Sequence, residues 1–221
     1  MERPLNRHAG IAGATGLVGT ELLKQLLEDE RYAEVTAYVR RPLPDRHPKL
    51  RTVVVDFDRL GEEAPDARID DAYCCLGTTL RNAGSREAFR RVDADYVIAF
   101  AQLMQRAGAA AFVGVSAIGA SPSSSVFYSR TKGEVEVAVQ ALQLPRPCFV
   151  RPSFLVGSRA ESRPGERAGI TIATVLSPFL IGPLRKYRPI HVRTVARAMI
   201  VAALTGRSGP IESDELERLG A

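Results

Sequence analysis

The chain has 221 residues, 45% of them hydrophobic and 25% charged, with a formal net charge of +5. These values are ordinary for a globular domain, and the length allows a substantial core without disulfides or a structural metal. The basic residues are scattered and the aromatic residues make up only 6% of the chain. This pattern argues against nucleic acid as a partner.

The chain has three cysteines, Cys74, Cys75 and Cys148, whose spacing fits neither a disulfide framework nor a zinc site. We therefore expect no metal and a reducing compartment. The first residues show no apolar signal core, and no stretch approaches the length of a membrane span. A cytoplasmic protein that does not bind membranes is the resulting expectation.

Short apolar strands alternate with amphipathic helices along the chain. This order predicts an α/β fold, a Rossmann-like doubly wound parallel sheet flanked by helices. We expect one domain over residues 1–221, with residues 153–221 forming a small substrate-side extension that supplies a lid and the last helices. The expected strands cover residues 8–12, 35–40, 50–56, 71–76, 110–116 and 147–152, and the expected helices cover residues 17–29, 86–107, 125–142, 170–180 and 193–204.

The first strand is followed by the segment GATGLVG, residues 13–19, and then by an amphipathic helix. Glycines between a strand and a helix let the backbone approach a pyrophosphate, and the helix N-terminus favours its negative charge. The spacing GxxGxxG differs from the common GxGxxG of dinucleotide-binding proteins. The segment predicts a dinucleotide site with contacts from Gly13, Thr15, Gly16, Leu17 and Val18.

A second group of residues fits carbonyl chemistry. Tyr128 and Lys132 are four residues apart on an expected helix, so their side chains share one face. Tyrosine ordinarily titrates near pH 10, and a neighbouring ammonium group makes it a better proton donor by stabilising the phenolate. Lys132 can supply that ammonium and also bind a ribose hydroxyl. Ser116, at the end of the fifth strand, can donate a hydrogen bond to a carbonyl oxygen.

Together, GxxGxxG, the strand-end serine and YxxxK resemble the short-chain dehydrogenase/reductase superfamily. The segments YCCLGTT (73–79), FRRVDADYV (89–97), KGEVE (132–136) and ESRPGE (161–166) are most similar to an atypical branch, the family of the human Tat-interacting oxidoreductase and its bacterial relatives. The resemblance covers nearly the whole chain and implies an NADP(H)-binding Rossmann-like fold. It implies a cofactor more firmly than a reaction.

The resemblance also assigns roles to single residues. It places Asp56 at the adenine amino group, and Leu76 and Gly77 beside the ribose and nicotinamide half of the cofactor. In classical members an asparagine on the helix before the strand-end serine completes a proton relay. No asparagine matches it here, because Asn82 lies too early in the chain.

The end of the second strand indicates which dinucleotide binds. NAD enzymes place an acidic residue there to bind the ribose hydroxyls, whereas this strand ends in Arg40 and Arg41. A guanidinium group pairs with a 2′-phosphate that a carboxylate would repel. We therefore predict NADP(H) as the cofactor.

The sequence thus predicts an NADPH-dependent oxidoreductase of a small carbonyl substrate, with Ser116, Tyr128 and Lys132 as catalytic residues. An NADPH-binding redox sensor with little or no turnover is the alternative, and a protein partner is left open. Nucleotide-sugar epimerisation ranks lower, because the segment after Pro152 is short for a sugar-nucleotide domain.

Overall fold

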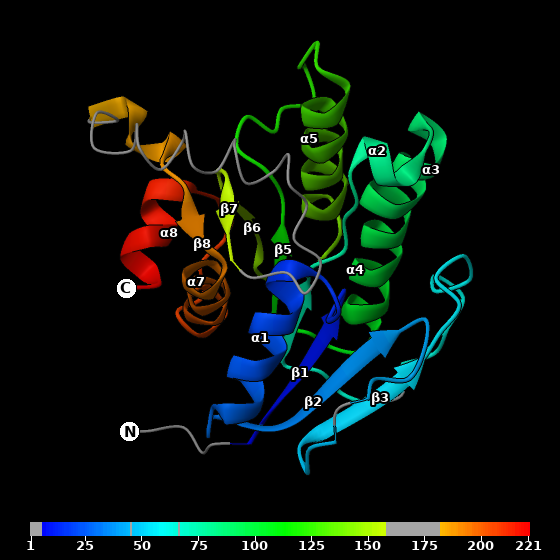
Figure 1. Ribbon diagram of the computed structural model, residues 1–221. Helices are drawn as coiled ribbons and strands as arrows, with labels where there is room; N and C mark the ends of the chain where they lie inside the picture. The colour runs from blue at the N-terminus through cyan, green and yellow to red at the C-terminus, as the bar shows by residue number, and fades with distance from the viewer. Residues whose placement is uncertain (1–5, 45, 66, 158–181) are drawn as a thin grey trace.

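The computed structural model describes residues 6–44, 46–65, 67–157 and 182–221 (Figure 1). The helix expected over residues 170–180 lies outside the described residues. So do the segment 161–166 and the other residues of 158–181, which belong to the extension expected to supply a lid.

A parallel sheet forms the centre of the described structure, and its strands stand in the order β3-β2-β1-β4-β5-β6-β9. Each strand runs parallel to its neighbours. The order reverses between β1 and β4, and this confirms the predicted doubly wound sheet. The strands are β1 (Arg7–Ala12), β2 (Tyr32–Val39), β3 (Leu50–Val54), β4 (Asp71–Cys74), β5 (Ala111–Val115), β6 (Pro147–Arg151) and β9 (Gly209–Glu212).

Helices cover both faces of the sheet (Figure 1). On one face, α1 (Leu17–Glu28) and α7 (Val192–Leu204) pack together, and α8 (Ser213–Leu219) lies against α7. On the other face, α4 (Tyr96–Arg106) and α5 (Phe127–Gln140) enclose a second core with the sheet. The two cores result from apolar residues at helical spacing, such as Leu22 and Leu26 of α1, which are fully buried.

The single helix expected over residues 86–107 consists of three pieces. These are α3 (Arg86–Arg90), a π-helical turn η1 (Arg91–Asp95) and α4. The Ser85 hydroxyl caps α3 by accepting the Ala88 amide, and Gly108 follows the end of α4 with φ of +80°. A π turn inserts one residue into the helix and re-aims the side chains around it.

The C-terminal part adds elements that the sequence analysis did not predict. Strand β9 extends the sheet beside β6, and α8 follows it directly. Pro210 lacks a backbone donor, which an edge strand tolerates. The remaining short elements are α2 (Leu80–Ala83), β7 (Leu155–Val156), β8 (Ile190–His191) and a 3-10 helix η3 (Gly182–Tyr187).

A buried polar cluster joins three strands at the amino-terminal edge of the sheet. Arg7 of β1 donates from Nε (2.6 Å) and Nη2 (2.5 Å) to the fully buried Asp71 of β4. Tyr32 of β2 donates to the same carboxylate at 2.8 Å, and its hydroxyl lies 2.7 Å from that of Tyr73. Burial raises the pKa of both tyrosines, so the cluster keeps its protons at neutral pH.

Candidate functional site

The glycine turn between β1 and α1 lies at the reversal of strand order, where doubly wound folds bind their ligands. Gly13 has φ of +81°, and a Cβ built on it would lie 2.5 Å from the Cys75 backbone. A Cβ on Gly19 would overlap the Gly13 carbonyl oxygen. Only glycine fits both positions, so the turn can stay tight against β4.

Helix α1 begins directly after this glycine turn. Gly16 caps the helix, no side chain bonds to its cap position, and its first turn contains no acidic residue. Val18 is buried and Leu17 packs at the edge of the core, so these two could reach a ligand through their backbone. Such an N-terminus suits a phosphate group.

A cleft of about 770 Å³ opens beside this turn. It runs over the carboxyl ends of β1, β2 and β4, and α3 and η1 contribute to its far wall. Among the described residues, no aspartate or glutamate lines it. Seven of the predicted cofactor-binding residues line the cleft: Gly13, Thr15, Gly16, Arg40, Arg41, Leu76 and Gly77.

Arg40 and Arg41 follow β2 directly and lie at one end of the cleft. Both side chains are exposed, and neither forms an ion pair with a carboxylate in the described part of the chain. Two guanidinium groups without a counter-charge fit a doubly charged phosphate ester.

Asp56 does not line the cleft. It is exposed, and its carboxylate accepts the amide of Asp58 at 3.0 Å, which closes the turn after β3. The neighbouring Phe57 lines the cleft instead, with its ring centroid 5.5 Å from that of Tyr96. The predicted contact of Asp56 with adenine stays a prediction, and Phe57 and Tyr96 offer an aromatic wall there.

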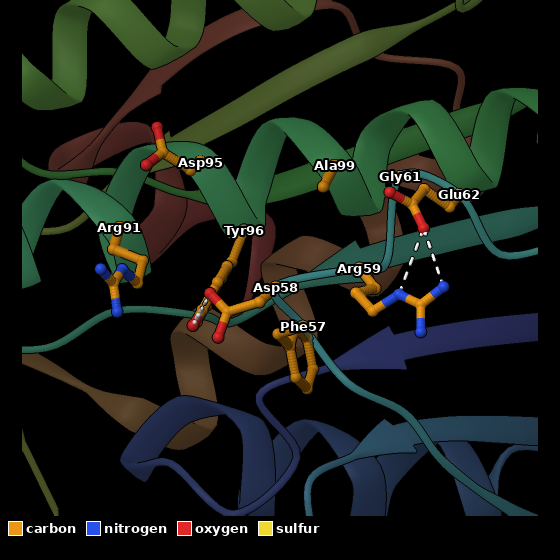
Figure 2. A pocket seen from close by; sticks show the side chains of 9 residues that line it. All are labelled: Phe57, Asp58, Arg59, Gly61, Glu62, Arg91, Asp95, Tyr96 and Ala99. Atoms are coloured by element: carbon orange, nitrogen blue, oxygen red, sulfur yellow. Dashed lines mark hydrogen bonds and ion pairs between the residues drawn. The ribbon is translucent and has the colours of Figure 1, made fainter.

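A smaller hollow of about 350 Å³ lies behind this wall (Figure 2). Phe57 and Tyr96 line both spaces. In Figure 2 the Tyr96 hydroxyl points to Asp58, to which it donates at 2.8 Å, and Arg59 pairs with Glu62. Burial and the bond to Asp58 raise the pKa of Tyr96, so the wall stays uncharged at neutral pH.

Lys132 does not line the cleft, but it lies close to Gly77, which does. A Cβ built on Gly77 would be 3.6 Å from the Lys132 Nζ. Lys132 is buried and pairs with the buried Asp93 of η1, with Nζ and Oδ1 2.8 Å apart. Burial lowers the pKa of Lys132, but Asp93, Tyr128 and Cys74 together raise it by more, so the pKa lies above its ordinary value.

Tyr128 occupies the first turn of α5, one turn before Lys132. Its ring lies 5.6 Å from that of Phe89 in α3, whose neighbours Ala88 and Val92 line the cleft. The negative charge of a Tyr128 phenolate would raise the pKa of Lys132 further. Neither Tyr128 nor Lys132 lines the cleft; both lie on α5, next to residues that do.

Ser116 follows β5, as expected, but its hydroxyl has a partner. It donates at 2.5 Å to Glu136, which lies one turn beyond Lys132 on α5. Arg151 of β6 binds the same carboxylate from Nε at 2.9 Å and from Nη2 at 2.5 Å, and it also reaches Glu212. Because its proton is bonded to Glu136, the Ser116 hydroxyl can accept a hydrogen bond from another group but cannot donate one. Neither Glu136 nor Arg151 was predicted as a site residue; the only sequence signal is that each is a charged residue between apolar neighbours.

The cysteine thiols have no catalytic geometry. Burial raises the pKa of Cys74 to about 12 and that of Cys75 well above its usual value, so both remain protonated. No group of three metal-ligating side chains occurs among the described residues. Within the same residues, no helix is long and apolar enough to cross a membrane.

The reversal of strand order and the glycine turn beside it define an NAD(P)-binding protein of Rossmann type. Residues 13–156 match the model of the NAD(P)H-binding family, and the chain belongs to this family. It is 38% identical to protein HTATIP2 of Rattus norvegicus over 211 residues, which cover 94% of this chain and 85% of that protein. The similarity confirms the resemblance to the atypical short-chain dehydrogenase/reductases.

The chain is also similar to other proteins in sequence and to solved structures in fold. The chain is 33% identical to the mitochondrial protein fmp52 of Aspergillus fumigatus, over 96% of this chain and 94% of that protein. Its fold matches the human epimerase family protein SDR39U1 with NADPH (TM-score 0.62, 19% identity, 95% of this chain and 77% of that one). It also matches the UDP-glucose 4-epimerase of Thermotoga maritima (TM-score 0.68, 14% identity, 96% and 81%). Because a relative's name says mitochondrial, the cytoplasmic location stays a prediction.

Proposed function

We propose that the protein is an NADPH-dependent oxidoreductase that reduces a small carbonyl compound. The observation that carries the proposal is the cleft itself. Its lining contains a glycine turn that excludes side chains at one point and two arginines that form no ion pair within the described residues. Lys132 lies close to Gly77 of this lining, one helical turn after Tyr128. When bound, NADP(H) supplies the hydride.

The residues of the chain fit this cofactor. The α1 N-terminus, with Gly13, Thr15 and Gly16, would hold the pyrophosphate, and Leu17 and Val18 would contribute backbone amides. Arg40 and Arg41 would bind the 2′-phosphate, and the absence of a carboxylate from the described cleft lining favours this phosphate over free hydroxyls. Leu76 and Gly77 would leave room for the ribose next to Lys132.

Tyr128 would donate the proton that the reduced carbonyl oxygen needs. Lys132 would bind a ribose hydroxyl and stabilise the phenolate left on Tyr128. Ser116 would donate to the carbonyl oxygen only after its hydrogen bond to Glu136 breaks, since one hydroxyl donates one hydrogen bond.

The test is NADPH oxidation with a panel of aldehydes and ketones, comparing the parent with Tyr128→Phe. We expect Tyr128→Phe to lose about 100-fold or more of kcat, the usual scale of a general acid, with NADPH affinity unchanged. Equal rates in the two proteins would remove Tyr128 from the mechanism.

One observation favours a second function, an NADPH-binding sensor with little or no turnover. The Ser116 hydroxyl is already bonded to Glu136, which a reductase would have to disturb and a binding protein would not. Tight NADPH binding without oxidation of NADPH by any member of the panel would support this alternative. Measurable turnover that depends on Tyr128 would exclude it.

A further inference from the structure

Asp93 is a buried carboxylate that has no role in the proposed reaction. Its side chain is only 1% exposed, and its two oxygens have different partners. Oδ1 lies 2.8 Å from the Lys132 ammonium nitrogen, and Oδ2 accepts the Thr78 amide at 2.7 Å. One carboxylate therefore joins the lysine of the proposed site to the loop that lines the cofactor cleft.

The π turn η1 explains how a helix residue reaches this place. Within the turn, Asp93 and Ala94 are buried whereas Arg91 and Asp95 are exposed. The extra residue of a π turn shifts the buried face of the helix, and such turns recur at functional sites. Gly77 completes the fit, because a Cβ there would approach Asp93 Oδ1 to 3.3 Å.

The charged and titratable groups around Lys132 come from three elements. Asp93 faces it from η1, Tyr128 precedes it on α5, and Cys74 faces it from β4. The two acidic groups that follow on α5 have other partners: Glu134 pairs with Arg90 and Glu136 with Arg151 of β6. In the described part of the chain, Asp93 is therefore the carboxylate that balances the buried ammonium.

We propose that Asp93 is a positioning residue of the site: it keeps the buried Lys132 amine charged and fixes it beside Gly77, at the cofactor cleft. The inference rests on the proposed NADP(H) site, because it gives Lys132 its position there. A buried lysine without a counter-charge loses its proton readily. Without Asp93, Lys132 would become neutral and could no longer stabilise a phenolate.

The experiment is an NMR titration of the lysine side chains, which does not need turnover. The chain has only four lysines, Lys24, Lys49, Lys132 and Lys186, so ¹³Cε-lysine labelling gives a simple spectrum. The Lys132 signal is assigned by its loss in Lys132→Arg. In the parent protein we expect Lys132 to titrate at higher pH than the other three lysines. A parent Lys132 that titrates below them would overturn the proposal before any Asp93 variant is made.

The decisive variant is Asp93→Asn, which keeps an oxygen for the Thr78 amide and removes both the charge and the oxygen that faces Lys132. We expect its Lys132 titration to move below that of the other three lysines. In steady-state assays, kcat/KM of this variant should fall as pH rises above neutrality, at pH values where the parent keeps its activity. Asp95→Asn, an exposed carboxylate in the same π turn, is the matched control and should titrate as the parent does.

The outcomes separate this inference from the proposed function. A Lys132 titration that is the same in Asp93→Asn and in the parent would overturn the role of Asp93, with or without turnover. If the titration moves but the parent reduces no carbonyl, the reductase proposal fails and the assignment of Asp93 stands.

Discussion

Single residues decide how closely the backbone can approach a bound phosphate. Gly13 combines a positive φ with contact to the Cys75 backbone, whereas Gly119 has φ of +76° with no atom within 4 Å of an added Cβ. Gly119→Ala should therefore lower the free energy of unfolding only by the cost of a left-handed residue, about 1–2 kcal/mol. Gly13→Ala should lower the free energy of unfolding by clearly more than this and should also abolish NADPH binding.

Urea unfolding and NADPH titration of both variants measure this difference. Equal losses of stability in the two variants, with NADPH binding retained, would show that the turn does not need its close approach to β4.

Some residues of the candidate site could be predicted from the sequence and others could not, for a physical reason. Gly13, Arg40 and Lys132 carry local signals, because a turn, a strand end and a helical spacing can be recognised within a few residues. The partners of Ser116 and Lys132 cannot be found this way. Glu136 and Asp93 reach them across other elements, and a single sequence contains no record of those contacts.

At the scale of elements, the strands and most helices followed from apolar runs and helical spacing. The π turn did not, because its hydrogen bonds shift by one residue while the apolar pattern continues from α3 into α4. Strand β9 was missed because four residues that include Pro210 carry little strand signal. Its place in the sheet comes from pairing with β6.

The cluster around Asp71 links β1, β2 and β4, and it should matter more for stability than exposed ion pairs do. Asp71→Asn removes the carboxylate that Arg7 contacts in a partly buried place, and we expect it to cost about 3–5 kcal/mol of unfolding free energy. Glu62→Gln breaks the exposed pair with Arg59 and should cost about 0–1 kcal/mol. Urea unfolding at neutral pH compares the two, and similar losses would mean that the cluster does not hold the strands together.

At the scale of the whole molecule, the fold positions one cleft at the reversal of strand order. The glycine turn, the arginines after β2 and the loop after β4 come from separate parts of the chain and meet there. This meeting could be predicted, because parallel strands place their carboxyl ends at one edge. The side hollow behind Phe57 and Tyr96 could not, since its shape depends on how η1 packs.

The central claim is that this cleft holds NADP(H) through Arg40 and Arg41, and calorimetric titration with NADPH and NADH tests it most directly. Hydrogen bonds to a charged phosphate contribute about 1.5–3 kcal/mol each, so the parent should prefer NADPH by about 10-fold or more. The double variant Arg40→Ala/Arg41→Ala should lose that preference and keep its NADH affinity, whereas Arg218→Ala on α8 should behave as the parent. Equal affinity of the parent for the two cofactors, or a preference for NADPH that survives the double variant, would contradict the account.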